Sequence, residues 1–507
     1  MAEYAKHTTA QAFEPSHAMF AALVTELAGP ACVQATHAEV EEHLTQRSRQ
    51  LTRQLLQDHL DLRAASEQRR PEGVTGTDQT TRTRVEHGHT RALTTVFGQV
   101  SVRRLAYRAP GAPNLYPADA QLNLPTTTHS HGLRRLAAIE AARGSYDDTV
   151  DAIDRATGVR LGKRQTEQLA ATAATDFDTF YARRSGPPGA AADLLVLSYD
   201  GKGIVMRPDA LRPAAARKAQ TTTSKLATRV SKGEKRHRKR MAEVGAVYDA
   251  VPVPRAPADI LPASHEQPPT ARPGPTAAAT WLTASVTQDA AQVVATVFDH
   301  AHRRDPDQQR RWVVLVDGNT HQIDRTHTEA TARGVDVTVI VDFIHVLEYL
   351  WNAAWCFFTE GNPTAEDWVR HHALAVLKGN ATTVARLIRR TATIAGLAPA
   401  RRTGIDTCAR YLINKAPYLD YPTALAAGWP IATGIIEGAC RYLVKDRMDI
   451  TGARWGLTGA EAVLKLRVLH ANGDFEEYWR YHLTQEQHRV HDSRYLDTTV
   501  PAVPTAA

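Results

Sequence analysis

The sequence predicts an α/β domain with an all-helical insertion, preceded by a mainly helical region that contains one short β-hairpin. Three short apolar runs, "LLVLSYD", "WVVLVD" and "VTVIVD", each end in an aspartate, namely Asp200, Asp317 and Asp342. Continuously apolar runs of this kind are typical of strands buried on both faces of a sheet. Helical periodicity fills the stretch from about 346 to 427. Together these patterns predict strands mixed with helices around an inserted helical block.

Length and composition limit the classes of protein to consider. The chain has 507 residues, of which 43% are hydrophobic, so it is long enough for more than one hydrophobic core. It carries 61 Lys and Arg against 54 Asp and Glu, an excess that suits a polyanionic partner where the charges cluster. The four cysteines are widely spaced and form no CxxC pair, so the sequence indicates neither a disulfide framework nor a zinc ribbon. With no long apolar run and no apolar leader, we expect a cytoplasmic protein without membrane contact.

Changes in pattern along the chain divide it into four parts. "RRSGPPGAA" has the small and breaking residues of a domain boundary, and "TVFGQVSVRRLAYR" alternates about "FGQ" as a hairpin does. We expect a helical region with a linker at 1–92, a hairpin and helical region at 93–184, the α/β domain at 185–485 with its insertion at about 346–427, and a disordered tail at 486–507.

Two successive helices within 93–184 are candidates for DNA reading. Ser145 and Asp148 give a helix-start signal, "TGVRLGK" reads as the turn, and the second helix opens at Lys163. A helix-turn-helix places the start of its second helix in the major groove of DNA. Two ordinary packed helices with solvated charges explain the pattern equally well. The candidate reading residues are Arg160, Lys163, Arg164 and Gln165.

The order of the acidic segments indicates a ribonuclease-H-like arrangement. In that fold the first strand lies beside the fourth, so acids at their ends face each other, and a third acid comes from a later helix. Here Asp200 and Asp317 end such strands, and Glu437 lies in the helical "GIIEGACRYLVKDRMD". Carboxylates this close repel one another unless hard cations lie between them. We therefore expect two Mg²⁺ or Mn²⁺ ions, which can hold both oxygens of an in-line phosphoryl displacement.

Each acid also has an ordinary structural explanation. An Asp before Gly at a strand end is often only a turn residue. Glu437 is different, because an acid among isoleucine, alanine and cysteine is disfavoured unless something pairs with it. Arg441 and Lys445 follow it at four-residue steps, which places them on its helix face as salt-bridge partners or as phosphate contacts.

Several motifs together resemble those of a known family. "YDGKG", "VDGN", "DFIHVLEYLW" and "GIIEGACRYLVKDRMDITGARW" are similar to bacterial insertion-sequence transposases of the ISKra type, and more distantly to Mutator-like transposases. "TVFGQVSVRRLAYR", "YPADAQLNLP" and "SYDDTVDAIDRATG" resemble the front half of that family, so the likeness covers roughly residues 90 to 480. The resemblance implies a DDE transposase with Asp200, Asp317 and Glu437 as its metal-binding catalytic triad. It also implies an oligomer that cleaves double-stranded DNA at transposon ends and joins it to target DNA.

The family's C/D-x-x-H signature is supplied here by "DFIH", with Asp342 and His345. A rival triad would use Asp342 in place of Asp317. We prefer Asp317 because the fourth strand should lie beside the first, whereas Asp342 lies one strand further out. His345 is either a packed helix residue or a residue that contacts DNA or braces the site.

A strongly basic segment follows the Asp200 strand. "ARKAQTTTSKLATRVSKGEKRHRKRM" holds ten Lys or Arg residues and one acid, Glu234. It is either a solvated loop or a surface that neutralises DNA phosphates beside the carboxylates. The candidate phosphate contacts are Lys232, Lys235, Arg236, Arg238, Lys239 and Arg240.

Two other functions remain compatible with these motifs. A decayed or domesticated element would keep the fold and bind DNA without cutting it. A structure-selective nuclease would use the same acids on DNA without terminal repeats. The intact acids weigh against the first, and the N-terminal helices and the insertion weigh against the second.

Overall fold

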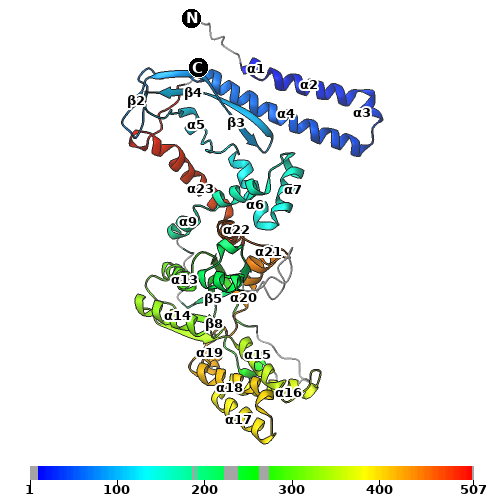
Figure 1. Cartoon of the computed structure of the whole chain (residues 1–507), viewed down its shortest axis with the longest axis vertical. Coiled ribbons are helices and arrows are strands. Elements are labelled where there is room, and N and C mark those ends of the chain that lie inside the picture. Colours follow the sequence, from blue (N-terminus) through cyan, green and yellow to red (C-terminus); the bar gives the residue numbers. More distant parts are fainter. Residues whose placement is uncertain are drawn as a thin grey trace. The chain divides into compact units, whose positions relative to one another are not determined.

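The chain divides into two compact units, which are described separately here (Figure 1). The computed structural model describes residues 9–184, 186, 189, 190, 192–221, 238–261, 273–450 and 452–504. The first unit comprises Met1–Phe180 together with Asp474–Ala507, and the second comprises Tyr181–Gly473. The last segment of the chain therefore belongs with the N-terminal region, which the expected boundary at 485 did not anticipate.

A long helix and the predicted hairpin form one half of the first unit. Helix α4 (His37–Ser66) begins with a capping box in which Thr36 and Glu39 satisfy each other's backbone N–H groups. Strands β3 (Arg84–Thr95) and β4 (Gly98–Arg108) pair antiparallel, which confirms the hairpin. Strand β3 starts before the expected boundary at 93. Its first half, "RVEHGH", is polar and has no buried residue, so it lacks the apolar alternation that would have predicted a strand. The shared core of the helix and the hairpin contains Leu60, Leu93, Val100, Val102 and Leu124.

Three helices form the second part of this unit: α6 (His131–Arg143), α7 (Tyr146–Thr157) and α8 (Lys163–Ala173). The expected start of α7 is confirmed by the capping box between Ser145 and Asp148. Gly158 ends α7 with φ +71°, a left-handed conformation that glycine adopts without strain. The core of the three helices contains Leu133, Ala137, Ile153, Val159, Leu161 and Leu169. The remaining helices are α1 (Thr9–Ala12), α2 (Glu14–Ala28), α3 (Pro30–Gln34), α5 (Pro117–Gln121) and α9 (Phe177–Arg183).

The C-terminal segment packs onto the first unit, and the prediction of a disordered tail from residue 486 is wrong for the residues described. Helix α23 (Phe475–Val490) continues into it, and Tyr495 beyond the helix is only 2% exposed. Tyr495 packs against a cluster that includes Val74 and Leu105. Further along, the carbonyl of Pro504 accepts a hydrogen bond from Gln68 N at 2.8 Å. The polar, proline-containing sequence of this segment predicted disorder. In the structure, one buried aromatic ring and backbone hydrogen bonds hold the segment in place.

A buried ionic network joins α23 to the rest of its unit. Asp176 accepts hydrogen bonds from His482 Nδ1 at 2.6 Å and from Arg489 at 2.9 and 3.1 Å. Burial raises the pKa of Asp176, but these hydrogen bonds outweigh it and bring the pKa down to about 2. The charged form of this carboxyl group therefore stabilises the first unit.

The second unit contains a five-stranded mixed sheet with the strand order β7-β6-β5-β8-β9. Strand β5 pairs antiparallel with β6 and parallel with β8, and β8 pairs parallel with β9. The strands are β5 (Leu194–Val205), β6 (Lys239–Ala250), β7 (Ala277–Ser285), β8 (Trp312–Val316) and β9 (Val337–Val341). The α/β class is therefore confirmed, and the strand that carries Asp200 lies at the centre of the sheet.

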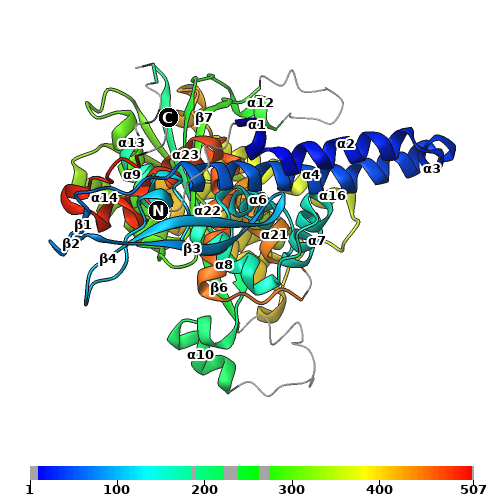
Figure 2. The same cartoon turned by 90° about the horizontal axis from the view of Figure 1, so that it is seen from above.

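Helices cover this sheet closely. Helix α13 (Ala290–Arg304) buries Val293, Val297 and Phe298. A Cβ atom on Gly245 of β6 would lie 2.3 Å from Val297, so the close approach of α13 requires glycine there. The other helices outside the insertion are α12 (Pro257–Ile260), α14 (Thr320–Arg333), α20 (Gly434–Ala439), α21 (Asp446–Met448) and α22 (Leu457–Ala471). Helix α10 (Pro213–Gln220) projects away from the sheet (Figure 2).

The insertion between β9 and α20 is helical, as predicted for about 346–427. Its helices are α15 (Phe343–Ala354), α16 (Pro363–Leu377), α17 (Ala381–Ile394), α18 (Thr403–Lys415) and α19 (Tyr421–Ala426). Cys408, Ala409 and Leu412 of α18 are fully buried, so this helix lies in the core of the insertion. Throughout the part of the chain that the structure describes, no helix has the length and apolar character needed to cross a bilayer.

Replacing Asp176 with Asn should lower the free energy of unfolding of the first unit by about 2 kcal/mol at pH 7. The folded pKa lies below the ordinary value, so the contribution is present above about pH 4 and is lost as the pH falls through about 2. Trp479 is the only tryptophan of this unit, so urea unfolding followed by the ¹⁹F signal of 5-fluoro-Trp479 would report on it. Equal unfolding of variant and wild type at pH 7 would contradict the assignment.

Candidate active site

The three aspartates of strands β5, β8 and β9 lie in one row across the sheet. Asp317 and Asp342 directly follow β8 and β9, whereas Asp200 lies within β5, which continues to Val205, so the expectation that this strand ends at Asp200 is wrong. Ser198 of β5 pairs with Leu315 of β8, and Leu315 pairs in turn with Ile340 of β9. Each aspartate is two residues beyond its member of this row, and neighbouring strands lie about 4.8 Å apart. The register therefore brings Asp200, Asp317 and Asp342 to the same edge of the sheet. The expected neighbours, the Asp200 and Asp317 strands, are adjacent, and Asp342 lies one strand further out.

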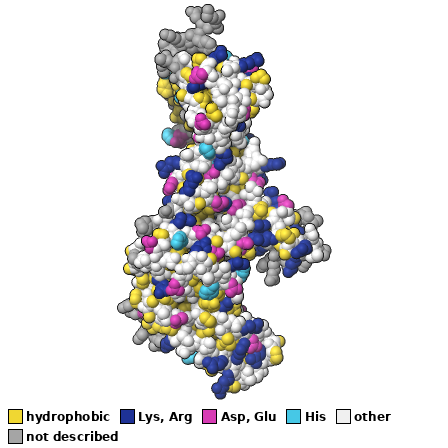
Figure 3. Space-filling view, turned by 90° about the vertical axis from the view of Figure 1, so that its left-hand side faces the viewer, with side chains coloured by type: hydrophobic (Ala, Val, Ile, Leu, Met, Phe, Trp, Pro, Cys, Tyr) yellow, Lys and Arg dark blue, Asp and Glu magenta, His cyan; other side chains and the backbone are white. Residues whose placement is uncertain are grey.

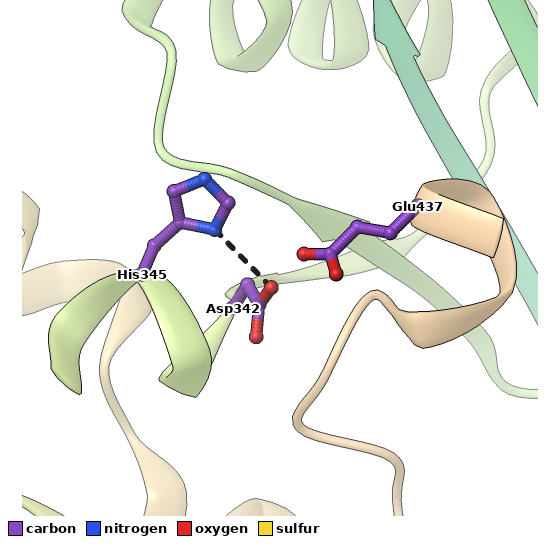
Figure 4. A group of neighbouring side chains, drawn as sticks. All are labelled: Asp342, His345 and Glu437. Carbon is purple, nitrogen blue, oxygen red and sulfur yellow. Dashed lines mark hydrogen bonds and ion pairs between the residues drawn. The ribbon is translucent and has the colours of Figure 1, made fainter. Parts of the chain in front are cut away.

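Asp342, His345 and Glu437 form a compact cluster at this edge (Figure 4). One ligand atom from each lies within 4.8 Å of the others. Asp342 is fully buried and caps α15, where it accepts hydrogen bonds from Ile344 N at 2.8 Å and His345 Nδ1 at 3.2 Å. Glu437 reaches the cluster from α20 and is exposed. The structure thus groups the glutamate with the rival second acid, Asp342, and its histidine.

Thr433 connects two of these carboxylates. Its hydroxyl is hydrogen-bonded to Asp342 Oδ2 and lies 3.2 Å from Glu437 Oε1. A hydroxyl carries one proton, so it can donate to only one of the two at a time. The pKa of Glu437 is raised by burial and by the negative charge of Asp342. A positive charge or a proton between Asp342 and Glu437 would therefore reduce the repulsion between the two carboxylates.

Asp200 lies in a more apolar part of the site. Burial raises its pKa, the hydrogen bond from Gly201 N at 2.6 Å opposes this, and the charge of Asp317 raises it again. The thiol of Cys440 also hydrogen-bonds to Asp200, and burial raises the pKa of this thiol. Cys440 was not predicted as a site residue. Its position three residues after Glu437, on the same helical segment, is the signal that could have identified it.

The Asp317 turn is held by the insertion. Its Oδ1 atom accepts a hydrogen bond from Asn319 N at 2.7 Å, and its carbonyl accepts one from Tyr411 Oη at 3.1 Å. Gly318 has φ +91°, and a Cβ atom on it would lie 2.6 Å from Tyr411 Oη. Lys415, on the same helix as Tyr411, donates to Thr320 Oγ1 at 2.8 Å. Nothing in the sequence pairs Tyr411 with a turn 94 residues earlier.

His345 adds positive charge among these acids. The hydrogen bond to Asp342 raises its pKa to about 9, with burial opposing and the charges of Asp342, Glu348 and Asp317 supporting the shift. The imidazole is therefore protonated at neutral pH. His345 is partly buried and hydrogen-bonded to Asp342, and its role in the site stays a prediction.

Arg441 and Lys445 are exposed, and the spacing argument for them needs correction. It assumed a continuous α-helix from Glu437, but Cys440–Lys445 forms a π-helical turn, which shifts the side chains that follow. In the described part of the chain neither residue forms an ion pair with Glu437. Such turns occur frequently at functional sites.

The predicted reading residues lie together at the start of α8. Arg160, Lys163, Arg164 and Gln165 are all exposed. Arg160 pairs with Asp154 at 3.0 Å, Lys163 pairs with Asp147 at 2.5 Å, and Gln165 accepts a hydrogen bond from Gly162 N at 2.9 Å. The helix pair is as expected, but two of its cations already contact acids of α7.

The predicted phosphate contacts after β5 are only partly described. Lys232, Lys235 and Arg236 lie outside the residues that the structure describes, and Lys239 begins β6 beside Arg238. Arg240 donates to the carbonyls of Val286 at 2.5 Å and Ala210 at 3.4 Å. Its guanidinium is thus held within the second unit, where burial lowers its pKa.

Comparison with known proteins gives no family for this chain. No protein-family model matches the sequence, and a search of curated proteins also found no match.

We expect the His345 imidazole to titrate with a pKa of about 9 and Asp342→Asn to lower that pKa by at least about one unit. The amide accepts a weaker hydrogen bond and carries no charge. Imidazole ¹H–¹⁵N NMR would measure both values, with His345→Gln used to assign the signal. A wild-type pKa near 6.5 would contradict the geometry of Figure 4.

Proposed function

We propose that the protein is a DDE transposase of the ISKra type, which cleaves double-stranded DNA at transposon ends and joins the ends to target DNA. The observation that carries the proposal is the row of three aspartates, with a helical glutamate beside them, at one edge of the sheet. Because two transposon ends must be joined, the working form is a homo-oligomer on DNA, at the nucleoid of the cytoplasm.

The sheet supports a ribonuclease-H-like fold for the second unit. The first strand of the unit, β5, lies between its second and fourth strands, and only β6 runs antiparallel to both of its neighbours. This order places the first and second expected acids, Asp200 and Asp317, side by side. The glutamate follows on a later helix after the insertion.

The donor set fits Mg²⁺ or Mn²⁺. These cations prefer oxygen ligands, and the edge of the sheet offers four carboxylates. Burial raises the pKa of Asp200 and of Glu437, and a neighbouring aspartate raises each further, so nearby positive charge would stabilise their ionised forms. Two bound cations would activate the attacking oxygen and stabilise the leaving 3′ oxygen.

In this proposal Asp200, Asp317 and Glu437 are the ligands. Asp342 remains the rival for the second position, because Glu437 lies nearest to it in the structure. The protonated His345 donates a hydrogen bond to Asp342, and the Thr433 hydroxyl lies within hydrogen-bond reach of both Asp342 and Glu437. The phosphate diester and water supply the reacting groups, so the mechanism needs no nucleophile from the chain.

Substitutions Asp200→Asn, Asp317→Asn and Glu437→Gln should each reduce excision by roughly 100-fold or more, and Asp342→Asn should leave measurable activity. The measurement is excision of a marker flanked by the inverted repeats beside the gene. Asp324→Asn, an exposed aspartate on α14, is the matched control and should excise normally. Normal excision by Asp317→Asn would remove it from the triad, and inactivity of wild type would favour the decayed DNA-binding protein.

Thr433→Val should lower the affinity for Mn²⁺ by about 10- to 100-fold while the protein stays folded. Valine keeps the shape of threonine but has no hydroxyl to donate a hydrogen bond to either carboxylate. Calorimetric titration with Mn²⁺ measures the change, and Thr407→Val, an exposed threonine of α18, serves as the control. Equal affinities for both variants would exclude this positioning role.

A further inference from the structure

The helical insertion carries a basic surface that none of the predicted DNA contacts includes. Between residues 368 and 419 the sequence has nine Lys or Arg residues and a single acid, Asp406. Six of these cations, which we call the insertion arginines, are carried by α17, α18 and the segment between them. They are Arg386, Arg389, Arg390, Arg401, Arg402 and Arg410.

The single acid cannot neutralise this surface. Asp406 pairs with Arg402 at 3.0 Å and lies 3.6 Å from Arg389. The other four arginines are exposed, and none of them pairs with an acid among the described residues. The surface therefore keeps an excess of positive charge that a partner from outside the chain can neutralise.

Helical periodicity separates this surface from the core of the insertion. Val384, Ala385 and Ile388 of α17 are buried. Arg386 and Arg390, one turn apart, lie on the opposite, exposed side of the helix. Figure 3 shows Lys and Arg side chains gathered at the lower end of the molecule, where Figure 1 places α17.

We propose that the insertion arginines bind the phosphate backbone of double-stranded DNA, outside the carboxylate site. This inference rests on the proposed function, for which it supplies a DNA contact on the second unit. Arginine matches phosphate geometry with paired donors, and such contacts position DNA without reading its sequence.

The same helix connects this surface to the site. The C-terminal part of α18 contacts the Asp317 turn through Tyr411 and Lys415, and Arg402 precedes its first residue. The helix has 13 residues and is therefore about 20 Å long.

A second copy of this chain is the alternative occupant, because Leu387, Ile394 and Ile413 are also exposed on these helices. A second copy would bring two positively charged surfaces together, which costs free energy. The charge therefore favours a polyanion over a copy of this chain.

The test compares two double variants of the full chain, each lacking two positive charges. Arg386→Gln with Arg390→Gln removes charge from the insertion. Arg311→Gln with Arg325→Gln removes it elsewhere on the second unit, where Arg311 contacts Asp336. Fluorescence anisotropy with a labelled 30-base-pair duplex of arbitrary sequence, in Ca²⁺ to prevent cleavage, gives the dissociation constant at several salt concentrations. Circular dichroism and light scattering check folding and oligomeric state.

We expect the insertion variant to bind more weakly and the slope of log affinity against log salt to fall by about 2, with little change in the control. An unchanged slope in the insertion variant, or an equal fall in both, would overturn the proposal while the proposed function stands. A variant that alters only the oligomeric state would assign the surface to a second copy. Absence of duplex binding by wild type would instead contradict the proposed function.

Discussion

The register of the three parallel strands is the constraint on which the site depends. It brings three carboxylates to one level on three neighbouring strands, where their negative charges repel. Nearby donors partly stabilise each negative charge. Gly201 N and the Cys440 thiol donate hydrogen bonds to Asp200. Asn319 N donates to Asp317, and protonated His345 donates to Asp342. Raised pKa values at Asp200 and Glu437 show that this compensation is incomplete. Incomplete compensation is what a site for external cations requires.

The insertion belongs to the architecture of this site because its helices hold the ends of the strands. Tyr411 donates to the carbonyl of Asp317, and the buried Tyr421 donates to the carbonyl of Val341 at 2.8 Å. Gly318 lets Tyr411 approach the turn closely. A force applied to α18, for example by bound DNA, would therefore act directly on the Asp317 turn.

Sequence patterns predicted what depends on local hydrophobicity and missed what depends on contacts across the chain. The apolar runs before Asp200, Asp317 and Asp342 predicted their strands, because strands buried on both faces of a sheet are almost continuously apolar in sequence. The strand register that aligns the aspartates depends on long-range packing, and so does the position of the Thr433 hydroxyl between two acids. A short stretch of sequence cannot predict either. The tail was misjudged for the same reason, since Tyr495 finds its buried partners more than 350 residues earlier. The π-helical turn after Ala439 likewise broke a spacing argument that assumed ideal helix geometry.

Asp317 and Asp342 compete for the role of second metal ligand, and they differ in the hydrogen bonds that each would lose on binding a cation. Asp342 is fully buried and accepts hydrogen bonds from Ile344 N, His345 and Thr433, which together lower its pKa although burial raises it. Binding a cation there would replace bonds that already stabilise its charge. Asp317 is partly exposed, and its carboxylate accepts a hydrogen bond from Asn319 N. It also lies on the strand next to Asp200, so a cation between those two carboxylates would relieve the repulsion that the fold leaves. We infer that Asp317 is the second ligand and that Asp342 holds His345 in place beside it.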